Sequence, residues 1–68
     1  MPDIDMLKEI IDNSGMTKVS IAKKSGISRE TLYNRLDGKG DFTVSEVHGL
    51  CEALKIDKKL RERIFFPR

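Results

Sequence analysis

This chain of 68 residues has little of what builds a large or cross-linked protein: one cysteine, two prolines, one tyrosine and no tryptophan. A single cysteine excludes an internal disulfide, and a lone thiol points to a reducing compartment. No apolar run approaches the roughly 18 residues that a membrane-spanning helix needs, and no basic-then-apolar leader opens the chain. We therefore expect one small domain without a membrane span, working in the cytoplasm.

Residues that carry catalytic or metal chemistry are equally sparse. His48 is the only histidine, and we expect an ordinary surface or core histidine there. Cys51 falls on an apolar helical stripe, where a packed thiol is expected. No nucleophile–base pair, carboxylate dyad, metal cluster or phosphate loop can be assembled from the sequence. We therefore expect neither an enzyme nor a bound cofactor.

The net charge of +2 is too small to indicate a polyanionic partner, but the positive charge is unevenly distributed. Residues 1–15 carry a charge of −3, whereas residues 16–40 hold six basic and two acidic residues, a charge of +4. Residues 41–68 add only +1, because acidic residues are interleaved with the bases. A basic segment in the middle of the chain suits a local surface that faces phosphates, although a solvated helix face is also often basic.

Turn residues and apolar spacing predict an all-α chain of five short helices with no strand. Four side chains are expected to cap helix starts, and Thr43 with Glu46 makes the pattern of a capping box. The expected caps are Thr17, Ser28, Thr43 and Asp57. The first three expected helices cover about residues 4–13, 18–24 and 29–36, and two more follow the caps Thr43 and Asp57, with apolar positions up to Leu54 and Ile64 respectively.

The second and third expected helices are joined by a turn of about four residues that contains Gly26. Glycine can take the positive φ that such a turn demands. Ala22 is small at the place where a second helix must cross closely. Two helices joined in this way form a helix-turn-helix unit, here over about residues 17–37, and residues 1–68 are predicted to make one domain around it.

Helical periodicity gives the third helix an outer face. Leu32 and Leu36 mark its inner side, so Glu30 and Asn34 fall on the opposite side at about 100° per residue. Arg29 begins this helix, at the end that enters the major groove first in this unit. Arginine, asparagine and glutamate can bond the edges of guanine, adenine and cytosine respectively. The polar side chains therefore form a candidate DNA-reading surface.

The stretch TKVSIAKKSGISRETLYNRLDGKGDFTVSEVHGLCEALKI resembles the helix-turn-helix domain of the phage repressor and Cro (XRE-type) family, and the likeness covers residues 4–64. It implies a compact, five-helix, lambda-repressor-like DNA-binding domain. Lys18, Arg29 and Glu30 stand where the family often has glutamine, so the operator sequence does not carry over. The matching positions are Lys18, Ala22, Gly26, Leu32 and the loop from Asp37 to Gly40.

The resemblance also implies which residues contact DNA and a second copy of the chain. Related proteins bind two half-sites as symmetric dimers with contacts from the C-terminal region, which here makes Phe65 and Phe66 the candidate interface residues. The alternative is that one or both of these rings fold back on the core. Base contacts are expected from Arg29, Glu30, Tyr33 and Asn34. Phosphate contacts are expected from Lys18, Ser28, Thr31 and Lys39.

These expectations describe a transcriptional regulator that binds double-stranded DNA. A small phage or prophage Cro-like repressor, covering a palindromic operator as a homodimer, is favoured because 68 residues leave no room for an effector domain. Two alternatives stay open. The chain could be a protein-binding helix-turn-helix module, an antirepressor that grips a partner repressor protein. It could also be the antitoxin of a toxin–antitoxin pair, which would combine both activities.

Overall fold

A computed structural model describes residues 1–67 and consists of five α-helices, with no strand in that part of the chain. The helices are α1 (Ile4–Asn13), α2 (Lys18–Ser25), α3 (Arg29–Leu36), α4 (Val44–Leu54) and α5 (Lys58–Phe65). The all-α prediction is confirmed, and α1 and α3 have the expected bounds. Among the described residues, no helix is both long and apolar enough to cross a membrane.

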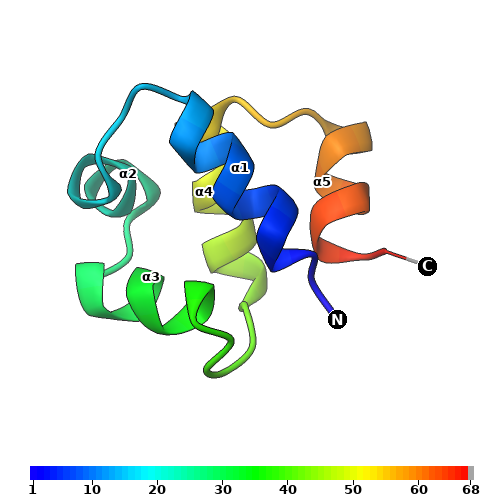
Figure 1. The fold of residues 1–68 in the computed structure, drawn as a ribbon, viewed down its shortest axis with the longest axis horizontal. Coiled ribbons are helices and arrows are strands. Elements are labelled where there is room, and N and C mark those ends of the chain that lie inside the picture. The colour runs from blue at the N-terminus through cyan, green and yellow to red at the C-terminus, as the bar shows by residue number, and fades with distance from the viewer. Residues whose placement is uncertain (68) are drawn as a thin grey trace.

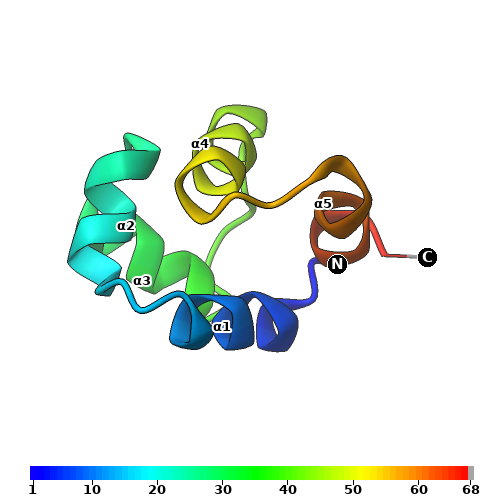
Figure 2. The same cartoon turned by 90° about the horizontal axis from the view of Figure 1, so that it is seen from above.

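The helices enclose an apolar core, with α3 along one edge of the molecule (Figure 1). The most extensive contact is between α2 and α4, while α3 also packs on α2 and α1 packs on α5. Figure 2 shows α2 and α5 on opposite sides of α4. The N-terminal residues meet the end of α5, where the Asp3 backbone N–H donates to the Ile64 carbonyl oxygen at 2.6 Å.

Each helix begins at a side chain that caps it. The capping oxygen always accepts a hydrogen bond from the backbone N–H three residues further on, and a lost cap of this kind costs about 1 kcal/mol. At α4 the predicted capping box is complete, because the Glu46 carboxylate also accepts from the Thr43 N–H at 3.0 Å. The five caps are Asp3, Thr17, Ser28, Thr43 and Asp57.

The turn between α2 and α3 depends on Gly26, whose φ of +77° lies in the left-handed region. The Ile27 N–H donates to the Ala22 carbonyl oxygen at 3.1 Å, and the Gly26 N–H donates to the Lys23 carbonyl oxygen at 3.3 Å. This pair of bonds defines a Schellman motif. The positive φ predicted for Gly26 is therefore confirmed, and the motif sets the direction in which α3 leaves α2.

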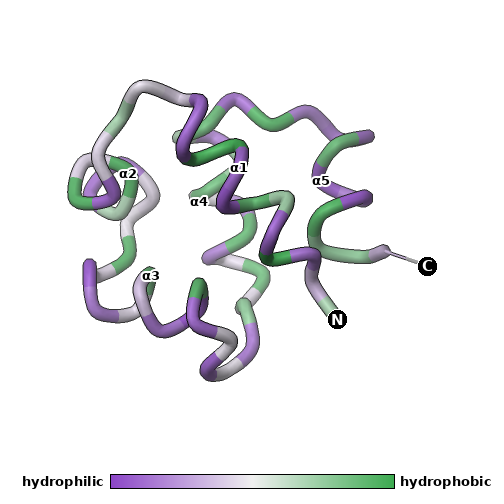
Figure 3. Tube along the Cα trace, in the orientation of Figure 1, coloured by the Kyte–Doolittle hydropathy of each residue, from purple (hydrophilic) through white to green (hydrophobic). Residues whose placement is uncertain are grey.

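All five helices contribute apolar side chains to the core. Figure 3 shows that the trace of α3 is largely hydrophilic, in keeping with a helix that buries only a narrow stripe. Cys51 is buried on α4, and burial raises the pKa of its thiol, an effect that Arg61 partly opposes. The core consists of Leu7, Ile11, Ile21, Ala22, Leu32, Leu36, Val47, Leu50, Cys51, Ile56, Ile64 and Phe65.

A close approach in the core lies between α4 and the end of α2. Gly49 lies inside α4, and a Cβ at this position would clash with the carbonyl oxygen of Ser25 and lie 3.2 Å from its Cα. Ser25 is itself buried, and its hydroxyl donates to the Ile21 carbonyl oxygen at 2.6 Å. Glycine at position 49 therefore lets the two helices touch through their backbones.

Gly49→Ala should lower the free energy of unfolding by about 1–3 kcal/mol, the usual effect of inserting a group into a packed contact. The loss is expected even though alanine favours helix over glycine by about 1 kcal/mol. Urea denaturation followed by circular dichroism measures it. Ser45→Ala, at an exposed site on the same helix, is the control and should stay within about 0.5 kcal/mol of the parent. A Gly49→Ala protein as stable as the parent would contradict the close approach.

Candidate nucleic-acid interface

Much of the outer face of α3 is exposed to solvent within residues 1–67. Arg29 and Glu30 are exposed, Tyr33 keeps 42% of its surface and Asn34 is half-buried. Within the described residues, no hydrogen bond or ion pair engages the side chains of Arg29, Glu30 or Asn34. These side chains are therefore free to bond an external partner.

A cation–π contact links the start of α2 to the middle of α3. The Lys18 ammonium nitrogen lies 5.9 Å from the centroid of the Tyr33 ring. A contact of this kind contributes about 0.5–1 kcal/mol at an exposed site. It places Lys18, which is expected to contact phosphates, beside Tyr33, which is expected to contact bases. The spacing of the two residues along the chain does not reveal this contact, because it depends on how α2 and α3 cross.

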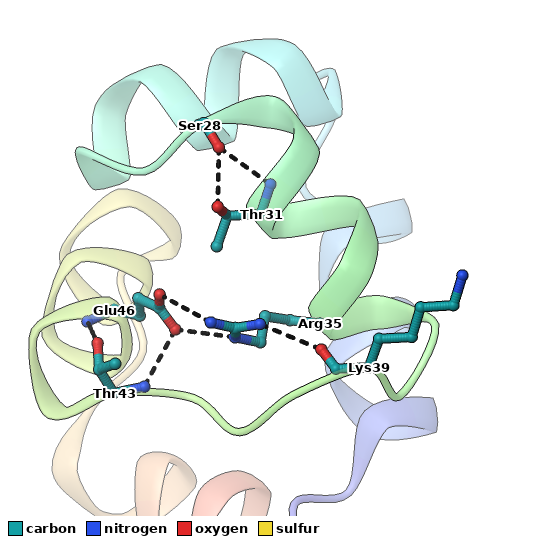
Figure 4. Close-up of polar contacts among 6 residues, drawn as sticks. All are labelled: Ser28, Thr31, Arg35, Lys39, Thr43 and Glu46. Atoms are coloured by element: carbon teal, nitrogen blue, oxygen red, sulfur yellow. Dashed lines mark hydrogen bonds and ion pairs between the residues drawn. The ribbon is translucent and has the colours of Figure 1, made fainter.

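The start of α3 is closed by a pair of hydroxyl groups. Ser28 Oγ accepts from the Thr31 N–H at 3.0 Å and donates to Thr31 Oγ1 at 2.8 Å (Figure 4). Both candidate phosphate-binding residues therefore lie in one local hydrogen-bond network at the start of α3.

Lys39 extends from the loop that follows α3. Gly38 ends the helix with a φ of +81°, and the Lys39 N–H donates to the Asn34 carbonyl oxygen at 2.8 Å. The side chain of Lys39 is exposed and points away from Arg35 (Figure 4). The structure thus places Lys39 beyond the C-terminal end of α3, while Lys18 lies against the middle of that helix.

Arg35, one of the basic residues of the middle segment, is turned inward. Its Nε lies 3.1 Å from Glu46 Oε1 and its Nη2 lies 3.4 Å from Glu46 Oε2. The two side chains keep only 20% and 13% of their exposure. The pair removes one positive charge from the segment that the charge distribution assigns to phosphates. No signal in the sequence marks it, because both residues look like members of solvated helix faces.

The two C-terminal phenylalanines have different surroundings. Phe65 is 6% exposed, and its ring packs edge-to-face on Phe42 with 5.2 Å between centroids. Phe66 is 57% exposed and lines a shallow hollow with Val44 and Val47. Phe65 therefore lies in the core of the monomer and has little surface for a second copy. The expected contact between two copies of the chain stays a prediction, and Phe66 is the more exposed of the two rings.

His48 is exposed, and its Nε2 lies 3.3 Å from Glu52 Oε1, one turn further along α4. Residues 1–67 contain no group of three or more His, Cys, Asp or Glu side chains that could hold a metal ion.

The glycine turn and the exposed polar helix that follows it define a helix-turn-helix DNA-binding domain. Residues 6–58 match the family model of the Cro/C1-type HTH DNA-binding domain. This chain belongs to that family, and the resemblance seen in the sequence is confirmed. Searches of curated proteins and of solved structures find no match to the chain.

Ser28→Ala should lower the free energy of unfolding by about 1 kcal/mol, because α3 loses the acceptor for the Thr31 N–H. Ser28→Asp is the matched variant, since aspartate accepts the same bond and should stay within about 0.5 kcal/mol of the parent. Urea denaturation of the three proteins provides the comparison. Equal stabilities for Ser28→Ala and the parent would show that the cap contributes nothing.

Proposed function

We propose that this domain is a sequence-specific transcriptional regulator, a small Cro-like repressor that binds a palindromic operator as a dimer. The observation that supports it is the uncovered outer face of α3, whose side chains are free while Leu32 and Leu36 hold the helix to the core. A helix presented in this way fits the major groove of B-DNA, which is about 12 Å wide.

Four side chains on this face are proposed to read base edges. Arg29 suits guanine O6 and N7, and Asn34 suits adenine N6 and N7. Glu30 suits the cytosine amino group, and because phosphates repel its carboxylate it adds discrimination more than affinity. The Tyr33 ring, steadied by Lys18, suits a thymine methyl group.

Phosphate contacts are proposed on both sides of the reading surface. Lys18 lies beside Tyr33, the Thr31 hydroxyl lies at the start of α3, and Lys39 follows its end. Ser28 contributes mainly by holding Thr31 and the first turn in place. Each phosphate neutralised by a lysine makes the salt dependence of log K steeper by about 0.9.

One copy of the domain presents one α3 and so reads one half-site. A dimer that reads two adjacent half-sites must hold its two α3 helices about 34 Å apart, and the hollow around Phe66 and Val44 is the proposed contact between the copies. Such a dimer would repress by covering a promoter and excluding polymerase.

The same exposed apolar residues favour a second candidate function. Phe66 and Val44 could instead hold a partner protein, as an antirepressor or an antitoxin would require. Selection of bound sequences from random duplex DNA separates the two functions. A palindromic motif supports the repressor, whereas no enrichment together with a tight protein partner supports the protein-binding module.

Asn34→Ala should relax the preference at particular base pairs and weaken specific binding by about 1–3 kcal/mol. Lys39→Ala is the contrasting variant: it should weaken binding to all sequences alike and reduce the salt slope by about 0.9. Gel shifts with the selected operator and with single-site variants measure both effects. An Asn34→Ala protein with unchanged specific affinity would contradict the assignment of α3 to base edges.

Phe66→Ala should weaken dimerisation, measured by sedimentation equilibrium, while the circular dichroism spectrum stays that of the parent, because the ring is largely exposed. Phe65→Ala provides the contrast. Removing a buried aromatic ring costs about 3–5 kcal/mol, so this variant should lose much of its stability. If Phe66→Ala lost the helical signal instead, the ring would belong to the core rather than to an interface.

A further inference from the structure

We propose that Arg35 is a positioning residue for DNA binding, which holds the backbone of Lys39 so that the lysine ammonium meets a phosphate beside α3. The inference rests on the proposed DNA-binding function and adds to it a residue that itself touches no DNA.

The Arg35 guanidinium joins three parts of the fold. Its Nε and Nη2 face the Glu46 carboxylate at the start of α4, at 3.1 and 3.4 Å. Its Nη1 donates to the Lys39 carbonyl oxygen at 3.1 Å (Figure 4). One planar group thus ties the end of α3 to the loop and to α4. A lysine at position 35 would carry the same charge. It would lack the planar fork of N–H donors (Nε, Nη1 and Nη2) with which Arg35 bonds Glu46 and Lys39 at once.

Both polar groups of the Lys39 backbone are bonded to residues of α3. Its N–H donates to the Asn34 carbonyl oxygen at 2.8 Å, and its carbonyl oxygen accepts from Arg35. A residue held at both groups loses much of the backbone freedom of an exposed loop. The Lys39 side chain therefore starts from a defined place next to Asn34, a residue of the proposed reading surface.

The carboxylate that holds Arg35 is itself fixed. Glu46 Oε1 accepts from Arg35 Nε at 3.1 Å and from the Thr43 N–H at 3.0 Å, while the Glu46 N–H donates to Thr43 Oγ1 at 3.1 Å. The capping box of α4 thus sets the orientation of the carboxylate. Because water reaches little of either side chain, salt screens this pair less than a surface pair.

The far end of the loop has its own anchor. Phe42 packs edge-to-face on the buried Phe65, with 5.2 Å between ring centroids. Lys39 therefore lies between a polar anchor at Arg35 and an apolar anchor at Phe42. A cation that is ordered before binding loses less conformational entropy when it meets a phosphate. A largely buried ion pair adds little net stability, because desolvation of the two charges offsets their attraction. The specific contribution of Arg35 is therefore its bond to the Lys39 carbonyl oxygen.

Arg35→Lys separates positioning from charge, because it keeps the net charge and removes the fork. We expect it to weaken binding to a labelled duplex of about 20 base pairs roughly eightfold at 0.1 M salt and to lower the salt slope by about 0.9, the effects of one lost phosphate contact. In the Lys39→Ala background the same change should weaken binding no further. Fluorescence anisotropy across a salt series measures all four proteins. Arg63→Lys, at an exposed site on α5, is the control and should bind like the parent.

Glu46→Asp is the second variant and stands in for Arg35→Lys if that protein loses its helical signal. Aspartate keeps the net charge and withdraws the carboxylate from Arg35 by one methylene, so a loss in the same direction is expected. A merely structural role would lower the stability and leave the salt slope unchanged. An unchanged slope, or effects of Arg35→Lys and Lys39→Ala that add, would overturn the proposal. No duplex binding by the parent at low salt would instead overturn the proposed function, and this inference with it.

Discussion

The close approach of α2 and α4 at Ser25 and Gly49 is the constraint on which the rest of the fold depends. Ser25 is the last residue of α2 and directly precedes the glycine that turns the chain into α3. A side chain at position 49 would push the end of α2 outward, and the turn and α3 would move with it. A backbone contact inside the core therefore sets the position of the helix proposed to enter the DNA groove.

The parts of this fold that follow from the sequence are those made by residues three or four positions apart. The caps at Thr17, Ser28 and Thr43 each join a side chain to a backbone N–H three residues on, so the sequence shows where these helices start. The outer face of α3 follows from Leu32 and Leu36 for the same reason. Local geometry is short-ranged, and it needs no knowledge of how the helices pack.

The parts that the sequence does not reveal are contacts between helices and one backbone conformation. Arg35 and Glu46 are eleven residues apart, and nothing in their spacing distinguishes them from charges on solvated faces. From the sequence, a glycine at position 49 would only weaken the helix α4. The structure shows that the Ser25 carbonyl oxygen lies where a Cβ at this position would be. Lys55 ends α4 with a φ of +56°, a conformation that the residue type disfavours, and the Ile56 N–H that follows donates to the Cys51 carbonyl oxygen at 2.9 Å.

The inward turn of Arg35 changes what the basic middle segment can do. With that charge neutralised by Glu46, the cations proposed to meet DNA at α3 are Lys18, Arg29 and Lys39, and Glu30 opposes them. If these are the cations that meet DNA, as proposed, binding to arbitrary DNA would be weak and its salt dependence shallow. Discrimination then depends on how well each side chain is held before binding. The cation–π contact between Lys18 and Tyr33 and the bond from Arg35 to the Lys39 carbonyl oxygen order two of these side chains next to α3. In the proposed function, this order would let a helix of eight residues read a sequence with little help from charge.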